Sequence, residues 1–124
     1  MLETRTTPDL KLDFVSGLDG RIPASDNLGA TTVILRYVPD RLTLEPASFD
    51  AYLGTMGEME WKSLEEIAVT FLNDFSNELI PRWAQVNVRS SSSALQHMGE
   101  LSVTVEDRQP KWENADLLSR LPPV

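Results

Sequence analysis

A continuous apolar stripe over residues 63–80 most constrains what this chain can fold into. Ser63 followed by Glu66 is a capping-box pattern, which predicts that a helix begins here. Pro81 ends that helix, because proline cannot continue its backbone hydrogen bonds. The apolar positions recur at three- and four-residue spacing, and they are Leu64, Ile67, Ala68, Phe71, Leu72, Phe75, Leu79 and Ile80. A helix with so long an apolar face has to be covered by a second layer.

Shorter patterns on both sides predict the remaining elements. Pro46 suits the first turn of another helix, whose apolar face consists of Phe49, Tyr52, Leu53 and Met56. Alternation or β-branched residues predict strands at 9–16, 30–38, 82–90 and 99–106. Residues 16–29 are rich in Gly, Asp, Asn and Ser, which predicts a loop, and a short helix is expected around 114–121.

The element order is therefore strand, strand, helix, helix, strand, strand. This order predicts an α+β fold, in which two helices cover one face of an antiparallel sheet. We expect a single domain over residues 1–124, with its core at about 9–106 and a C-terminal tail at 107–124. Four strands in one copy leave two sheet edges, which have to be blunted, covered or paired with another chain.

Composition excludes several classes of function. The net charge of −8 repels a phosphate backbone, so we expect no nucleic-acid partner. The chain has no cysteine and His97 is its only histidine, which argues against a metal site. No apolar run is long enough to span a bilayer, and the first residues lack the apolar segment of a secretory signal. We therefore expect a cytoplasmic protein without a membrane partner.

Four motifs gather between residues 37 and 83. They are Tyr37-Val38-Pro39-Asp40, the group Glu45, Ser48 and Tyr52, the pair Asn73-Asp74, and Pro81-Arg82-Trp83. Together they resemble the NADPH-dependent nitrile reductases, which convert 7-cyano-7-deazaguanine to its aminomethyl form in queuosine synthesis. That family has Tyr-Ile/Val-Pro-Asp, Glu-Ser-Lys-Ser, Asn-Asp and Pro-Arg-Tyr at the matching places. The resemblance covers about residues 10–90.

The resemblance implies the tunnelling fold, shared with GTP cyclohydrolases, pyruvoyl-tetrahydropterin synthases and uricases. In that fold, subunits join their sheet edges into barrels and ligands bind between subunits, so a homo-oligomer is implied. It also implies that Glu65 anchors a purine- or pterin-like ring through two N–H bonds, and that Glu45 lies near the ligand. The residues alone support simpler roles: Glu65 is favoured by the helix dipole, and Glu45 is a solvated residue before proline.

Departures from the family remove its chemistry. Ile22 stands where the family has its nucleophilic cysteine, and Gly29 where it has the aspartate that transfers protons. Ala47 and Asp50 replace lysines, so the attraction for the phosphates of NADPH is lost and no cofactor is expected. Leu64 replaces the histidine beside the anchoring glutamate. No residue is therefore assigned a catalytic role.

Three interpretations remain open. The first is a nitrile-reductase-like protein that has lost the reductase activity and binds a planar nitrogen heterocycle between subunits. The second is an enzyme of queuosine biosynthesis that acts on 7-cyano-7-deazaguanine or a related purine or pterin. Ser25 or Asp26 would substitute for the lost groups only through a rearrangement of the loop, and an unactivated serine needs a base, whereas no histidine lies nearby in the sequence. The third is a structural subunit that assembles with an active paralogue.

Overall fold

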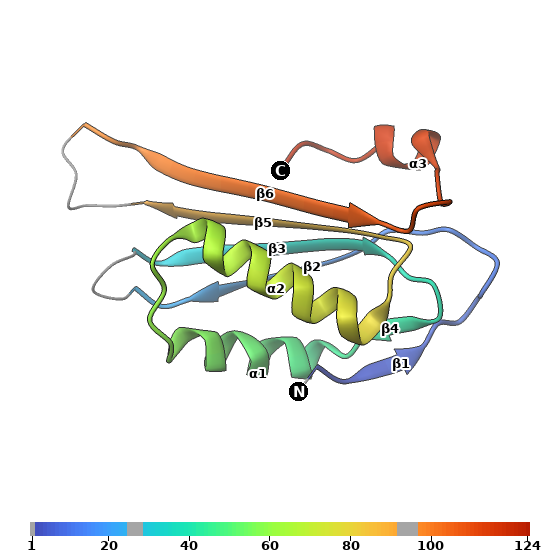
Figure 1. Cartoon of the computed structure of the whole chain (residues 1–124), viewed down its shortest axis with the longest axis horizontal. Coiled ribbons are helices and arrows are strands. Elements are labelled where there is room, and N and C mark those ends of the chain that lie inside the picture. Colours follow the sequence, from blue (N-terminus) through green and yellow to red (C-terminus); the bar gives the residue numbers. More distant parts are fainter. Residues whose placement is uncertain (1, 25–28, 92–96) are drawn as a thin grey trace.

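The chain folds into α+β layers, as expected (Figure 1). A computed structural model describes residues 2–24, 29–91 and 97–124. Its elements are β1 (Thr4–Thr6), β2 (Ser16–Ile22), β3 (Thr31–Val38), β4 (Leu42–Leu44), α1 (Pro46–Gly57), α2 (Leu64–Leu79), β5 (Trp83–Ser91), β6 (Glu100–Arg108) and α3 (Ala115–Ser119). The main sheet is antiparallel with the strand order β2-β3-β5-β6, and β1 pairs with β4 in a small second sheet. Both long helices lie on one face of the main sheet.

The predicted stripe is confirmed as the buried face of α2. Ser63 has an extended backbone, and its Oγ accepts a hydrogen bond from the Glu66 N–H at 3.2 Å, which is the predicted cap. Phe71 and Phe75 are fully buried in the middle of the stripe. Burying a large apolar side chain contributes about 1.5–3 kcal/mol, so this face holds the helix on the sheet.

Aromatic rings fill the space between the two helices and β3. Tyr37 lies edge-on to Phe75 with 4.9 Å between the ring centroids, and Phe71 lies 5.2 Å from Tyr52 and 5.7 Å from Phe49. Edge-to-face and tilted pairs at these distances contribute beyond the area they bury. Valines and leucines from the inner faces of β3 and β5 complete the core, namely Val33, Leu35, Val86 and Val88.

Ile80 departs from the predicted stripe. It follows the last turn of α2 with φ 45° and ψ 58°, and its side chain is 65% exposed. The following Pro81 disfavours a helical conformation here, and the chain turns through the left-handed region instead. The prediction that the apolar face includes Ile80 is therefore wrong, because the helix ends one residue earlier.

The first strand of the main sheet was predicted in the wrong place. Residues 9–15 are not a strand, and their apolar side chains Leu10 and Leu12 are 54% and 57% exposed. The strand is instead β2, in the segment predicted as a loop from its glycines. Gly20 allows α1 to lie close to the strand, because a Cβ at this position would lie 2.3 Å from Leu53 Cδ1 of α1 and the Leu53 side chain would have to shift. A glycine inside a strand marks close approach of another element, and here that element is a helix.

The small sheet of β1 and β4 was not predicted. Its register pairs Thr4 with Leu44 and Thr6 with Leu42, and three-residue strands leave too short a pattern to recognise. Leu2 and Leu44 both belong to the core cluster, so the core extends beyond the predicted limit at residue 9. Hydrogen bonds from the backbone around β1 fix the start of α1, since the Glu3 N–H donates to Ser48 Oγ at 3.0 Å.

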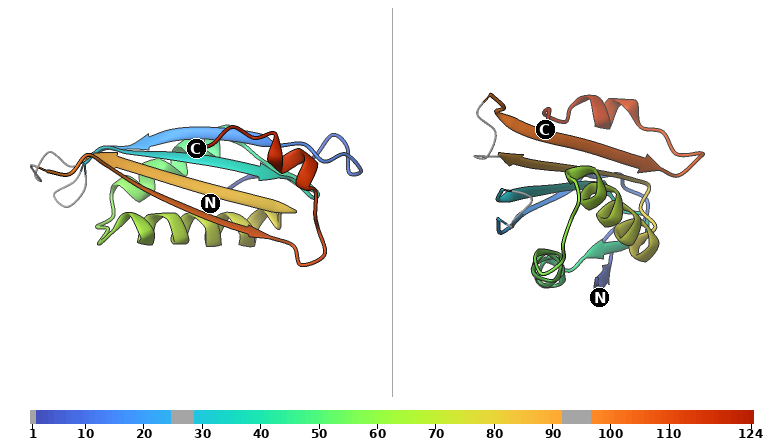
Figure 2. Two further views of the ribbon diagram at one scale, coloured as in Figure 1. Left: turned by 90° about the horizontal axis from the view of Figure 1, so that it is seen from above. Right: turned by 60° about the vertical axis from the view of Figure 1, so that its left-hand side comes forward.

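The C-terminal tail, residues 109–124, lies on the face of the main sheet that the helices leave open (Figure 2). β6 ends at Arg108, so the tail begins two residues later than predicted. The expected short helix is α3, and Asn114 caps it by accepting a hydrogen bond from the Leu117 N–H at 3.1 Å. No helix in the described ranges has the length and apolar character that a membrane span requires.

Candidate functional site

Glu65 occupies the second position of α2, where its side chain is exposed. Within the described ranges its carboxylate has no hydrogen-bond or ion-pair partner. The backbone N–H of its neighbour Glu66 donates to the capping hydroxyl of Ser63. The other neighbour, Leu64, is fully buried in the core. Glu65 is thus more exposed than either neighbour, and its carboxylate is available to a ligand.

Glu45 precedes α1 and is already paired. Its Oε1 accepts a hydrogen bond from Arg5 Nη2 at 2.6 Å, and its Oε2 is bound by Arg5 Nε. The pair ties β1 to the start of α1, which is a structural role that the sequence did not suggest. Because Arg5 is exposed, this ion pair contributes at most about 1 kcal/mol to stability.

The structure does not bring Glu45 and Glu65 together. Glu45 stands before α1, Glu65 is in the first turn of α2, and the two helices run in opposite directions (Figure 1). α1 has 12 residues, so it is about 18 Å long and separates the two carboxylates by most of that length. A ligand that contacted both residues would therefore have to lie between different copies of the chain.

Ile22 and Gly29 stand where the reductases have their cysteine and aspartate, and both are closely packed against other residues. Ile22, at the end of β2, is buried, and a Cβ added to Gly57 of α1 would lie 3.5 Å from Ile22 Cγ2. A Cβ on Gly29 would lie only 2.0 Å from the backbone oxygen of Ser91, so an aspartate does not fit there. Ser25 and Asp26, named above as substitutes, lie outside the described residues.

The open face of the main sheet carries a polar network that the sequence analysis missed. Arg36 of β3 donates from Nε and Nη2 to Gln85 Oε1 on β5, at 3.0 and 2.5 Å. Its Nη1 donates to the backbone oxygen of Pro122 in the tail at 2.6 Å. Burial lowers the pKa of Arg36, and the charge of Glu106 on β6 acts in the opposite direction.

Asn87 forms the centre of a second part of this network. It is only 1% exposed, and its Nδ2 donates to Ser102 Oγ at 3.0 Å and to Thr104 Oγ1 at 2.8 Å. Its Oδ1 accepts from Arg89 Nε at 2.8 Å. The signal in the sequence was the alternation of Gln85, Asn87 and Arg89 with valines, which places three polar side chains on one face of β5.

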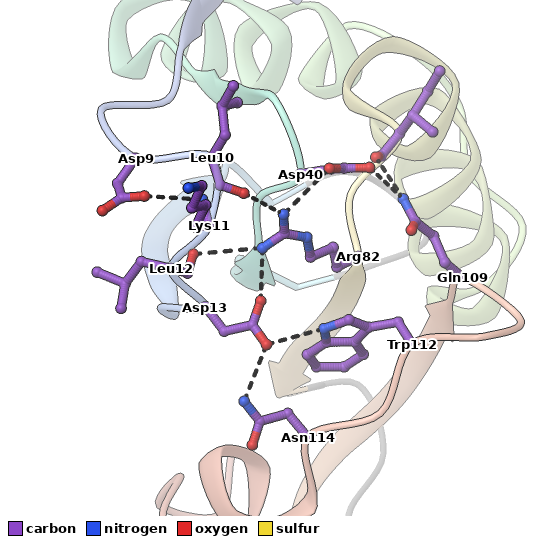
Figure 3. A network of polar contacts seen from close by, with 11 residues as sticks. Asp9, Leu10, Lys11, Leu12, Asp13, Asp40, Arg82, Gln109, Trp112 and Asn114 are labelled. Atoms are coloured by element: carbon purple, nitrogen blue, oxygen red, sulfur yellow. Dashed lines mark hydrogen bonds and ion pairs between the residues drawn. The ribbon is translucent and has the colours of Figure 1, made fainter.

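Arg82 binds the segment 9–15 directly and is linked to the C-terminal tail through Asp13 (Figure 3). Its guanidinium donates to the backbone oxygen of Leu10 at 2.6 Å and to Asp13 Oδ1 at 2.7 Å, and it lies 3.5 Å from Asp40. Asp13 Oδ2 accepts from the Trp112 indole and from Asn114, each at 3.1 Å. Arg82 and Asp13 thus use their polar groups on other residues of the chain. The network, a clamp, holds the segment 9–15 and the tail in place, which is a structural role.

The charge state of Asp13 follows from this clamp. Burial raises the pKa of Asp13, but the hydrogen bonds from Asn114, Arg82 and Trp112 and the charge of Arg82 together outweigh it. The pKa of this carboxyl therefore lies below its usual value, and Asp13 is ionised at neutral pH.

Asp74 of α2 has a structural partner as well. The hydroxyl of Tyr52 on α1 donates to Asp74 Oδ2 and links the two helices. Burial raises the pKa of Tyr52 far above its ordinary value, and the hydrogen bond and charge of Asp74 add to the effect. Tyr52 is therefore a permanent donor at physiological pH rather than an acid.

Comparison with known proteins finds no family model and no curated protein that matches the chain. Among the described residues, no group of three or more His, Asp or Glu side chains is placed to hold a metal ion.

Proposed function

We propose that this chain is a nitrile-reductase-like protein of the tunnelling fold that binds a planar nitrogen heterocycle and performs no reduction. The observation that carries this proposal is the exposed carboxylate of Glu65 in the first turn of α2, which no described residue binds. A carboxylate can accept two parallel N–H bonds from the edge of a guanine-like or pterin-like ring. The same position carries the anchoring glutamate in the family that residues 37–83 resemble.

The proposed site lies where copies of the chain meet. β2 and β6 are the outer strands of the main sheet, so each has backbone groups on one side without a strand partner in the described chain. Strand directions alternate across the four strands, so β2 and β6 are antiparallel to each other. The β6 edge of one copy can therefore continue into the β2 edge of the next, and repetition of this contact gives a ring when the rotation between copies closes.

The absence of reductase activity follows from two positions. Isoleucine at 22 offers no nucleophilic atom, and its side chain is part of the core. The backbone of Ser91 approaches Gly29 so closely that no side chain with a proton to transfer fits there. A protein with these two residues can hold a heterocycle at Glu65 without forming a covalent bond to it.

Thermal shift with candidate rings tests the proposal. We expect guanine, 7-cyano-7-deazaguanine or a pterin to raise the melting temperature of the full-length protein, because a ligand that binds only the folded state stabilises it. Glu65→Gln should reduce the affinity at least tenfold, since an amide offers only one acceptor to the ring edge. Incubation with 7-cyano-7-deazaguanine and NADPH should leave the NADPH absorbance unchanged.

Glu60→Gln is the matched control, because Glu60 is an exposed glutamate in the loop before α2. This variant should bind the ring as the wild type does. Equal binding by Glu65→Gln, or no stabilisation by any of the rings, would contradict the ligand assignment. Consumption of NADPH would instead favour the interpretation as a queuosine-pathway enzyme.

A further inference from the structure

The tail borders an open cavity on the face of the main sheet that the helices leave uncovered, away from Glu65. The cavity has a volume of about 530 Å³ and lies between strands β3, β5 and β6 and the residues that follow α3. Figure 2 shows the tail crossing this face on the side opposite the helices. A volume of this size falls in the range of small-molecule sites, which are usually lined by apolar walls and a few polar groups.

The floor of the cavity has more hydrogen-bond donors than acceptors. Gln85 uses its side-chain oxygen for Arg36, which leaves its amide N–H groups without an acceptor in the described chain. Among the described residues, the Arg108 guanidinium makes one hydrogen bond, from Nη2 to Glu106 Oε2 at 3.4 Å, so most of its five donors are available. The same Glu106 oxygen also accepts from the Trp83 indole at 3.2 Å.

Arginine outnumbers acidic residues among the side chains of the floor. Two guanidinium groups, from Arg36 and Arg108, stand against one side-chain carboxylate, that of Glu106, and the last residue, Val124, also lines the cavity. An anion is the ligand that satisfies the free donors of Gln85 and Arg108.

The opposite wall of the cavity is apolar. Leu118, Leu121, Pro122 and Pro123 of the tail line it, and each offers only carbon side-chain atoms. An inorganic anion would leave this apolar wall exposed to water. An aliphatic or aromatic group attached to the anion would cover the wall and remove its apolar surface from water, which is favourable.

We propose that the cavity binds a small organic carboxylate, with the carboxylate held by Arg108 and the Gln85 amide and the apolar body packed against Leu118 and Leu121. The site is independent of the proposed function, because it contains neither Glu65 nor the outer backbone of β2 or β6. Arg36 holds the tail in place through Pro122 and thereby fixes the apolar wall over the floor.

Nuclear magnetic resonance of the ¹⁵N-labelled full chain tests this site with benzoate as the probe. The indole N–H of Trp83 is the reporter, because it donates to Glu106 at the cavity floor. The indole of Trp61 is the internal reference, since this residue lies between α1 and α2 in the sequence, is buried, and donates to the Met56 backbone oxygen, outside the cavity. We expect benzoate to shift the Trp83 signal saturably in the millimolar range and to leave the Trp61 signal in place.

Three comparisons make the test decisive. Benzylamine, which has a similar ring and the opposite charge, and inorganic phosphate, which has no apolar body, should each shift the Trp83 signal at least tenfold less than benzoate. Arg108→Ala should weaken benzoate binding at least tenfold, and Leu121→Ala several-fold. Arg120→Ala, which removes an exposed tail charge that does not line the cavity, should leave it unchanged.

Several results would overturn the assignment. The absence of any Trp83 shift with benzoate excludes the site, and equal shifts with phosphate show a simple anion site without recognition of an apolar body. Equal shifts with benzylamine, or benzoate binding that survives Arg108→Ala, contradict the role given to the charge. A melting curve for each variant separates loss of binding from loss of folding.

Discussion

Tyr37 and Tyr52 both bury their rings between the helices and the sheet, but their hydroxyls meet different partners. The Tyr37 hydroxyl accepts a hydrogen bond from the buried Leu44 N–H at 2.8 Å. The Tyr52 hydroxyl donates to Asp74, which is exposed to water. The difference matters because a buried group that loses its partner bears the whole desolvation cost, whereas an exposed carboxylate finds water.

Tyr37→Phe should therefore be more destabilising than Tyr52→Phe. We expect Tyr37→Phe to lower the free energy of unfolding by about 1–3 kcal/mol, because it leaves the Leu44 N–H unpaired inside the core. Tyr52→Phe should cost about 0.5–1.5 kcal/mol, the net value of an ordinary hydrogen bond. Urea denaturation of the three proteins measures both values. Equal costs would show that the β4 backbone reaches water when the hydroxyl is removed.

At the scale of the elements, β2 and α1 approach each other closely at one point. An added methyl on Gly20 would lie 2.3 Å from Leu53 Cδ1 and 3.4 Å from Phe49 Cε2. Gly54, which lies on α1 one residue after Leu53, has no atom within 4 Å of the same added methyl. The two glycines thus differ in their surroundings and offer a matched pair.

Gly20→Ala should lower the free energy of unfolding by about 1–3 kcal/mol, since Leu53 would have to leave its rotamer. Gly54→Ala should raise it by about 0.5–1 kcal/mol, because alanine is the better helix former in open space. Urea denaturation measures both effects.

A double variant checks the cause. Leu53→Ala vacates the space that the new methyl of Gly20→Ala needs, so the double variant should be less destabilised than the sum of the single ones. A coupling of about 0.5–3 kcal/mol is usual for residues in contact. If the two single changes in the free energy of unfolding simply add up in the double variant, the strain does not come from the contact with Leu53.

Local patterns were sufficient for the elements whose contacts repeat along the chain. The cap at Ser63, the stripe of α2 and the alternation of β5 and β6 each depend on neighbours a few residues away, and these predictions are confirmed. β2 was missed because Gly20 is explained only by Leu53, 33 positions away, a fact of tertiary packing. Leu10 and Leu12 imitate a strand, but the backbone of this segment is held by Arg82.

The candidate sites divide in the same way. The exposure of Glu65 could be anticipated, since the stripe of α2 leaves the second helical position outside. The partner of Glu45 could not, because Arg5 reaches it only through the unpredicted pairing of β1 with β4. The cavity above Arg36 depends on where the tail crosses the sheet, and no local pattern encodes that path.

At the scale of the whole molecule, the long outer strand β6 is the feature that has to be explained. It contains nine residues, nearly all exposed, and its only strand partner in the described chain is β5. Leu101 on this strand is 39% exposed. An exposed edge of this length is a template for pairing with another chain unless charge or a covering segment blocks it.

We therefore expect the protein to form a ring through β6 and β2, with a mass that is a multiple of 13.9 kDa. Leu101→Lys should shift the population toward single copies, because a lysine on an edge strand opposes pairing with a second edge. Leu12→Lys is the control, since Leu12 is at least as exposed but lies outside every strand. Light scattering after size-exclusion chromatography measures the masses, and hydrogen exchange should show protected outer amides of β6 only in the assembled form. A wild-type mass of 13.9 kDa at every concentration would contradict the ring, and with it the placement of the Glu65 site between copies.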